Sequence, residues 1–180
     1  MFQAGLDHLV QLKRLPSGLK IQPPLPVYNL GLREVNKSSG FNASGKLVSW
    51  RYFATGETDV SGDIDLSSNP KLTSIAYGEQ VSLTLAALRL CENSAEIQGI
   101  ELEPRLIRIP GLRLECLWLN PLTQSAGGDG EWAIPYNQLI RELDPKKLHP
   151  GGELLPILQK WAAEAFRKSR LPIIPGSPVD

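Results

Sequence analysis

The sequence predicts an α+β fold, in which one antiparallel sheet of about six strands carries helices packed on one face. Two observations lead to this prediction. Apolar and polar residues alternate in six segments, which form two sequential runs of three. Two further segments, 79–92 and 153–169, repeat apolar residues at helical spacing, one between the strand runs and one after them.

The first 45 residues are expected to form an extension outside the compact domain. Residues 2–10 carry Phe2, Leu6, Leu9 and Val10 at helical spacing, which predicts a short amphipathic helix. The stretch 19–32, LKIQPPLPVYNLGL, contains three prolines, which remove backbone donors and favour extended geometry. We therefore expect a proline-rich arm, docked or free, followed by a polar loop over residues 36–45.

The first run of strands begins near Lys46. Period-two alternation predicts strands in LVSWRYFA (47–54), TDVSGDIDLS (58–67) and KLTSIAYG (71–78). Short links rich in Gly, Ser, Asn and Pro separate them, so we expect an antiparallel meander.

The segment 79–92 follows the first run of strands. Its Leu and Ala content favours a helix, although the alternation of Val81, Leu83 and Leu85 leaves a strand open.

The second run comprises IELEPRLIRI (100–109), GLRLECLWL (111–119) and EWAIPY (131–136). The middle segment is apolar on both alternating faces in its second half, which predicts an interior strand covered on both sides. The last helix, 153–169, places Pro156 in its first turn, and we expect Trp161 at the centre of its packing against the sheet. Residues 46–170 thus form a single domain, and 171–180 form a flexible tail.

Three aspartates in ETDVSGDIDLS (57–67) raise the question of a metal site. An EF-hand loop starting at Asp59 would need glycine where Ile64 stands and glutamate where Pro70 stands, so that pattern fails. Asp63 and Asp65 form an Asp-x-Asp pair, a pattern that holds a divalent ion bridged to a phosphate in some nucleotide-sugar transferases. The alternation instead predicts that all three carboxylates face water from a half-buried strand.

Composition limits the classes of partner. The 19 basic and 19 acidic side chains balance, which argues against a dominant nucleic-acid partner. No apolar run reaches the length of a membrane span, and the N-terminus lacks the pattern of a secretory signal, so a cytoplasmic location is expected. Cys91 and Cys116 have no metal-ligand spacing and are expected to be buried thiols, with a disulfide left open. No cofactor is expected.

The motifs favour a non-catalytic protein-interaction or adaptor module. KIQPPLP places Lys20, Pro23 and Pro26 in the pattern of a proline-rich ligand, and Trp132, beside a glycine-rich loop, is expected to be partly exposed. The other three tryptophans are expected in the core. The alternative is an enzyme or small-ligand-binding protein whose site assembles only in three dimensions, from Asp63, Asp65, Glu131 and His149.

Overall fold

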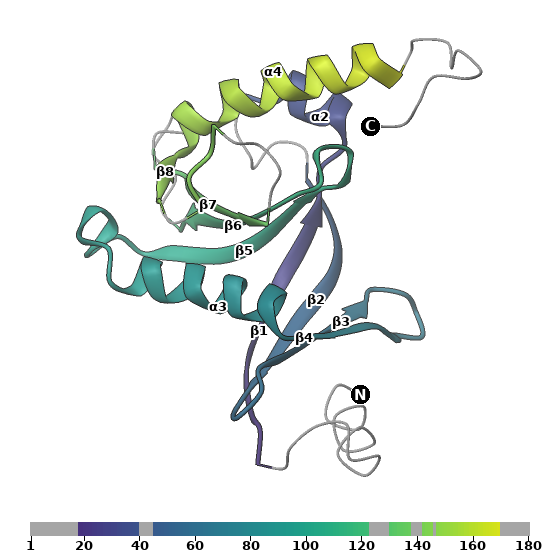
Figure 1. The fold of residues 1–180 in the computed structure, drawn as a ribbon, viewed down its shortest axis with the longest axis vertical. Coiled ribbons are helices and arrows are strands. Elements are labelled where there is room, and N and C mark those ends of the chain that lie inside the picture. Colours follow the sequence, from purple (N-terminus) through teal and green to yellow (C-terminus); the bar gives the residue numbers. More distant parts are fainter. Residues whose placement is uncertain (1–17, 40–44, 123–129, 138–141, 146, 170–180) are drawn as a thin grey trace.

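The computed structural model describes residues 18–39, 45–122, 130–137, 142–145 and 147–169 (Figure 1). The predicted N-terminal helix and the C-terminal tail lie outside these residues. Within them, eight strands form one sheet in the order β4-β3-β2-β1-β5-β6-β7-β8. The strands are β1 (Lys20–Asn29), β2 (Lys46–Thr55), β3 (Val60–Asp65), β4 (Leu72–Tyr77), β5 (Leu102–Ile109), β6 (Leu114–Pro121), β7 (Trp132–Asn137) and β8 (His149–Pro150).

The strands that alternation predicts are confirmed. β2, β3 and β4 form an antiparallel meander, and β5, β6 and β7 form a second one. β6 lies inside the sheet and is buried along nearly its whole length, as its apolar residues on both faces predict. The segment after the first meander is helix α3 (Glu79–Glu92), so the strand alternative is wrong.

The sheet is larger than predicted because β1 lies at its middle. Residues 20–29, expected to be an arm, pair antiparallel with β2 and parallel with β5, and so join the two meanders. The prolines are tolerated for local reasons. The pairing with β2 shifts register between Gln22 and Leu25, which places Pro23 and Pro24 in an irregularity, and the parallel pairing with β5 begins only at Val27.

Helices cover both faces of the sheet, so the prediction of one covered face is wrong. Figure 1 shows α3 on one side, and α2 (Leu32–Lys37) with α4 (Gly151–Ser169) on the other. The core beneath α3, here called the α3-side core, includes Val81 and Leu85 of the helix with Leu106 and Leu117 of the sheet. The second core lies beneath α4. Strands that are apolar on both faces require cover on both, which explains the arrangement.

Two elements that the sequence patterns do not predict complete the α4 side. The short strand β8 pairs with β7 and leads directly into α4. Helix α2 follows β1 and contacts α4, where the Gln159 side chain donates to the backbone oxygens of Val35 and Ser38 at 3.3 and 2.9 Å. Pro156 lies in the second turn rather than the first, because α4 begins at Gly151.

The centre of the α4 packing is aliphatic. Leu154, Leu158 and Ala162 are fully buried, whereas Trp161 is half-buried at the margin and donates its indole N–H to Glu142 at 2.9 Å. The prediction that Trp161 sits at the centre is therefore wrong.

We expect Leu158→Ala to destabilise the protein by roughly 2 to 5 kcal/mol, because it leaves a cavity in a closed core. Trp161→Ala should cost clearly less, on the order of 1 kcal/mol, because the ring is already partly in water. Denaturant unfolding of both variants measures the difference. An equal or larger loss for Trp161→Ala would contradict the aliphatic centre.

Candidate functional site

The first meander presents an uncharged face on the side opposite α3. Pairing of β2, β3 and β4 aligns three cross-strand rows there. We call these nine residues the open face: Ala54, Val60 and Tyr77; Tyr52, Gly62 and Ile75; Trp50, Ile64 and Leu72.

The open face is apolar and partly exposed. Trp50 is 36% exposed and Tyr77 is 69% exposed, and Leu66, just beyond β3, is 46% exposed. The prediction that Trp50 belongs to the core is therefore wrong. Among the described residues, only sheet residues and Leu19 make up the apolar cluster here; α2 and α4 lie over the other half of the sheet (Figure 1). Exposed apolar patches of this kind mark interaction surfaces in soluble proteins.

Strand β4 forms the edge of the sheet beside the open face. In the described part of the chain it pairs with β3 alone, so its outer backbone groups have no ladder partner. Its sequence, LTSIAY, contains neither charge nor proline, and no residue in it is fully buried. Proteins usually protect a long edge strand with lysine, proline or a covering loop. β4 has none of these devices in its own sequence.

The opposite face of the same strands carries a closed ring of ion pairs. Arg51 of β2 donates Nε to Asp63 Oδ1 at 2.8 Å and Nη1 to Glu115 Oε2 at 3.3 Å. Arg108 of β5 donates Nε to Glu115 Oε1 at 2.7 Å and Nη2 to Asp63 Oδ2 at 2.5 Å. Each carboxylate thus binds both guanidinium groups, and the four charges sum to zero.

Tyr136 of β7 extends this ring by donating its hydroxyl to Glu115 Oε2 at 3.2 Å. Burial, reinforced by Glu115, raises the pKa of Tyr136 well above its ordinary value, so the phenol stays neutral and remains a donor. Burial alone would lower the pKa of Arg51, but Tyr136, Glu115 and Asp63 outweigh it and the pKa is raised. Arg51 therefore stays charged and Tyr136 stays neutral, which suits these two groups to structural rather than proton-transfer work.

The structure corrects the prediction for the aspartates. Asp63 is 3% exposed and belongs to the ion-pair ring, so its carboxylate does not face water. Asp65 is half-exposed, and its Oδ1 accepts the Lys71 N–H at 2.8 Å and the Ser67 hydroxyl at 3.0 Å. Asp59 precedes β3 and is also half-exposed. The two members of the Asp-x-Asp pair therefore have different partners and do not share a ligand position.

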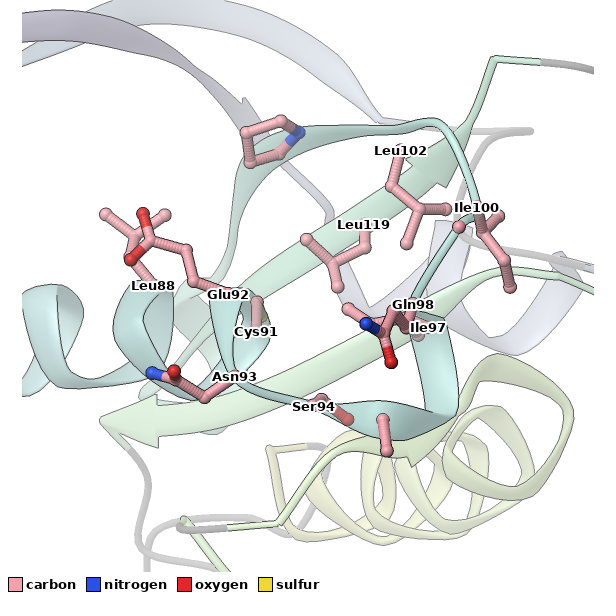
Figure 2. A pocket seen from close by; sticks show the side chains of 13 residues that line it. Leu88, Cys91, Glu92, Asn93, Ser94, Ile97, Gln98, Ile100, Leu102 and Leu119 are labelled. Carbon is pink, nitrogen blue, oxygen red and sulfur yellow. The ribbon is translucent and has the colours of Figure 1, made fainter.

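A groove of about 640 Å³ opens where the chain leaves α3 and enters β5 (Figure 2). Its apolar lining includes Leu88 and Cys91 from α3, Ile97 from the short helix after it, and Leu102 and Leu119 from the sheet. Polar side chains at the groove are Glu92, Asn93, Ser94 and Gln98. Glu92 is the single ionisable group among these four polar side chains. The groove lining therefore offers surfaces for binding but no pair of polar residues for acid–base catalysis.

Cys91 is not activated. Burial, with the charge of Glu92 added, raises the pKa of its thiol to about 12, so almost no thiolate exists at neutral pH. We expect iodoacetamide to alkylate Cys91 in the folded protein at pH 7.5 at least about ten times more slowly than in urea. Peptide mass spectrometry measures both rates, and equal rates would contradict an inert thiol. In the structure Cys91 and Cys116 are both free thiols.

The remaining predicted site residues are dispersed. Lys20 and Pro23 are exposed on β1, but Pro26 is buried, so β1 must leave the sheet before this segment fits an aromatic groove. Trp132 is half-buried against the α3-side core. Glu131 is buried beside β7, and His149 lies in β8, the edge strand at the end of the sheet far from β3. The alternative site therefore does not assemble, because Asp63 and Asp65 lie on β3, across the sheet from Glu131 and His149.

The described residues contain neither a metal-ligand cluster nor a membrane-spanning helix, and no similar protein supplies a functional assignment. Over the described ranges, no three His, Cys, Asp or Glu side chains gather as metal ligands. No helix in this part of the chain has both the length and the apolar character needed to cross a membrane. Comparisons with protein-family models, curated proteins and solved structures found no match.

Proposed function

We propose that this protein is a non-catalytic protein-interaction module that binds its partner through the open face. The observation that carries the proposal is the open face itself, because nine adjacent sheet residues without a charge include the exposed aromatic rings of Trp50 and Tyr77. Aromatic residues are enriched in protein interfaces, where large rings bury much area at low conformational cost. A partner that presents an apolar helix or sheet surface would fit this face.

The polar chemistry supports binding rather than catalysis. In the ion-pair ring, both carboxylates are occupied by guanidinium groups, so neither is available as a general base. The groove contains a thiol whose pKa is raised to about 12 by burial, the opposite of the shift that a nucleophile needs. These residues fit a rigid scaffold for a binding surface.

A second candidate function is binding of a small apolar ligand in the groove. Its volume of about 640 Å³ lies within the range of pockets that hold small molecules. Leu88, Leu102 and Leu119 supply an apolar lining, while Asn93, Ser94 and Gln98 offer hydrogen bonds at its margin. An uncharged, largely apolar molecule suits this combination.

The open-face proposal is tested by comparing three tagged baits in an extract of the native host. The test bait carries Trp50→Lys and Tyr77→Lys, and the control bait carries Leu83→Lys, since Leu83 is similarly exposed at 37% but lies on α3. We expect wild type and control to enrich the same proteins by quantitative mass spectrometry, and the test bait to lose them. Unchanged enrichment by a folded test bait would overturn the open face as the binding surface.

The groove candidate is tested with the neutral dye Nile red. Binding there should give saturable fluorescence that Leu88→Trp reduces by filling the space, while Leu83→Trp, outside the groove lining, leaves it unchanged. Dye fluorescence that responds equally to both substitutions would argue against a specific ligand site. Circular dichroism of each variant establishes that the fold is intact.

A further inference from the structure

We infer that β4, the edge strand beside the open face, pairs antiparallel with β4 of a second copy of the chain. The inference rests on the proposed interaction function, and the second copy extends the open face rather than covering it. It starts from the sheet edges: β4 offers six residues, whereas β8, at the other edge, has two and passes directly into α4. Of the two sheet edges formed by the described residues, β4 is the one long enough to add a strand from another molecule.

A two-fold axis allows β4 to pair with itself in a register centred on Ile75. Directly opposite residues in an antiparallel pair lie on the same face, so Ile75 meets Ile75 of the second copy. Ser74 then meets Ala76, and Thr73 meets Tyr77. Every such pair is uncharged, and Ile75 and Tyr77 place the two open faces side by side.

Charge favours this partner over a charged one. The open face and β4 offer no charged side chain that would select an acidic or basic protein, and pairing of identical strands brings no like charges together. The chain has 19 basic and 19 acidic residues and a formal net charge of zero, so two copies approach without net repulsion. The dimer also joins two partly exposed apolar faces into one continuous surface.

Oligomeric mass tests the inference directly on the full chain. At about 100 µM, where a dimer with a micromolar Kd is populated, light scattering should give twice the chain mass of 19.8 kDa. A lysine that points from an edge strand blocks such pairing. We therefore expect Thr73→Lys and Ile75→Lys to give 19.8 kDa, while Ser82→Lys, exposed on α3, keeps the dimer. A monomeric wild type would overturn the inference.

A disulfide trap tests the register. Opposite Cα atoms in an antiparallel pair lie about 4.5 to 5.5 Å apart, within the range that a disulfide spans. Ile75→Cys should form a covalent dimer under mild oxidation, whereas Ser82→Cys should not. A dimeric wild type in which Ile75→Cys fails to cross-link would overturn β4 pairing.

The two proposals fail in different ways. If light scattering shows a monomer while the open-face bait loses a captured protein, the interaction function stands and its partner is another protein. If β4 cross-links but the captured proteins do not depend on the open face, the dimer stands and the interaction function must lie elsewhere.

Discussion

Replacing Asp63 with alanine is expected to lower the free energy of unfolding by roughly 3 to 5 kcal/mol at pH 7. Asp63 accepts hydrogen bonds from both Arg51 and Arg108, and its own side chain is almost fully buried. Its removal leaves Arg51, with a side chain 7% exposed, facing Glu115 as its one remaining carboxylate partner in the ring. A buried guanidinium that has lost a partner still carries its desolvation penalty but lacks part of the Coulombic attraction that offset it.

Asp65→Ala is the matched control, since it removes a carboxylate two residues further along the same strand. We expect it to leave the unfolding midpoint in urea close to that of wild type at pH 7, because its carboxylate is in solvent. The backbone hydrogen bond from Lys71 lowers the pKa of Asp65. The ionised carboxylate therefore adds to the free energy of unfolding above the ordinary aspartate pKa, and this addition is lost as the pH falls through the lowered pKa. Equal losses in the two variants at pH 7 would contradict the special role of Asp63.

A double substitution separates the charge from the space it occupies. Replacing Arg51 with methionine and Asp63 with leucine keeps apolar volume between the strands and leaves Arg108–Glu115 as the one remaining ion pair of the ring. Apolar replacement of a buried ion pair is often neutral or stabilising, so the double variant should recover part of the loss seen for Asp63→Ala. A double variant less stable than the single one would show that Arg51 has a further structural role.

The fragment 46–170 is expected to lack a fixed tertiary structure, although the sequence alone predicts that it folds as a domain. The fragment removes β1, which pairs with β2 on one side and with β5 on the other. Without β1, the edges of β2 and β5 lose their ladders, and Phe53, Leu106 and Leu117 lose the cover of Leu25 and Val27 in the α3-side core. The near-ultraviolet circular dichroism signal should be largely absent.

A fragment that starts at residue 18 is the control, since it keeps β1 and omits only the preceding segment. We expect it to show the near-ultraviolet signal and a cooperative thermal transition. If 46–170 shows the same signal and transition, the boundary at residue 46 is correct and β1 contributes little to the fold. Both fragments are compared at equal concentration, because association would otherwise shift their apparent stability.

Local patterns predict most of the sheet because alternation reports burial on one face of a strand. LVSWRYFA, KLTSIAYG and GLRLECLWL each appear as strands in the positions expected. The same method misses β1, because three prolines in ten residues are typical of an arm. What permits β1 is non-local: an irregularity opposite β2, and a parallel partner that engages only after the last proline.

The ion-pair ring was not predicted because its members come from four strands. Each member of the ring lies on the strand face whose neighbouring positions, two residues away, include a buried residue. The members are Arg51, Asp63, Arg108 and Glu115. Two basic and two acidic residues at such positions were the available signal, since buried charges require opposite partners. Alternation shows that Asp63 belongs to a polar row, but which row faces a helix depends on where α3 packs.

The sequence does not predict the open face, because its apolar residues look like a buried row although no helix covers them in the described structure. Its residues have the composition of a core row, so Trp50 and Ile64 were expected to be covered. Sequence patterns cannot tell whether a helix reaches across a given half of a sheet. Here α4 lies over β7 and β8 and contacts α2, and the apolar row of the first meander stays partly exposed.

The central position of β1 also has a consequence for synthesis on the ribosome. β1 can pair with β2 as soon as both have emerged, but its parallel partner β5 comes much later in the chain, with the first meander and α3 between them. Closing so long a loop is entropically costly, and folds with distant strand pairing form slowly. We expect the β1–β4 half to collapse first and to wait, with the outer side of β1 unpaired, until β5 is translated.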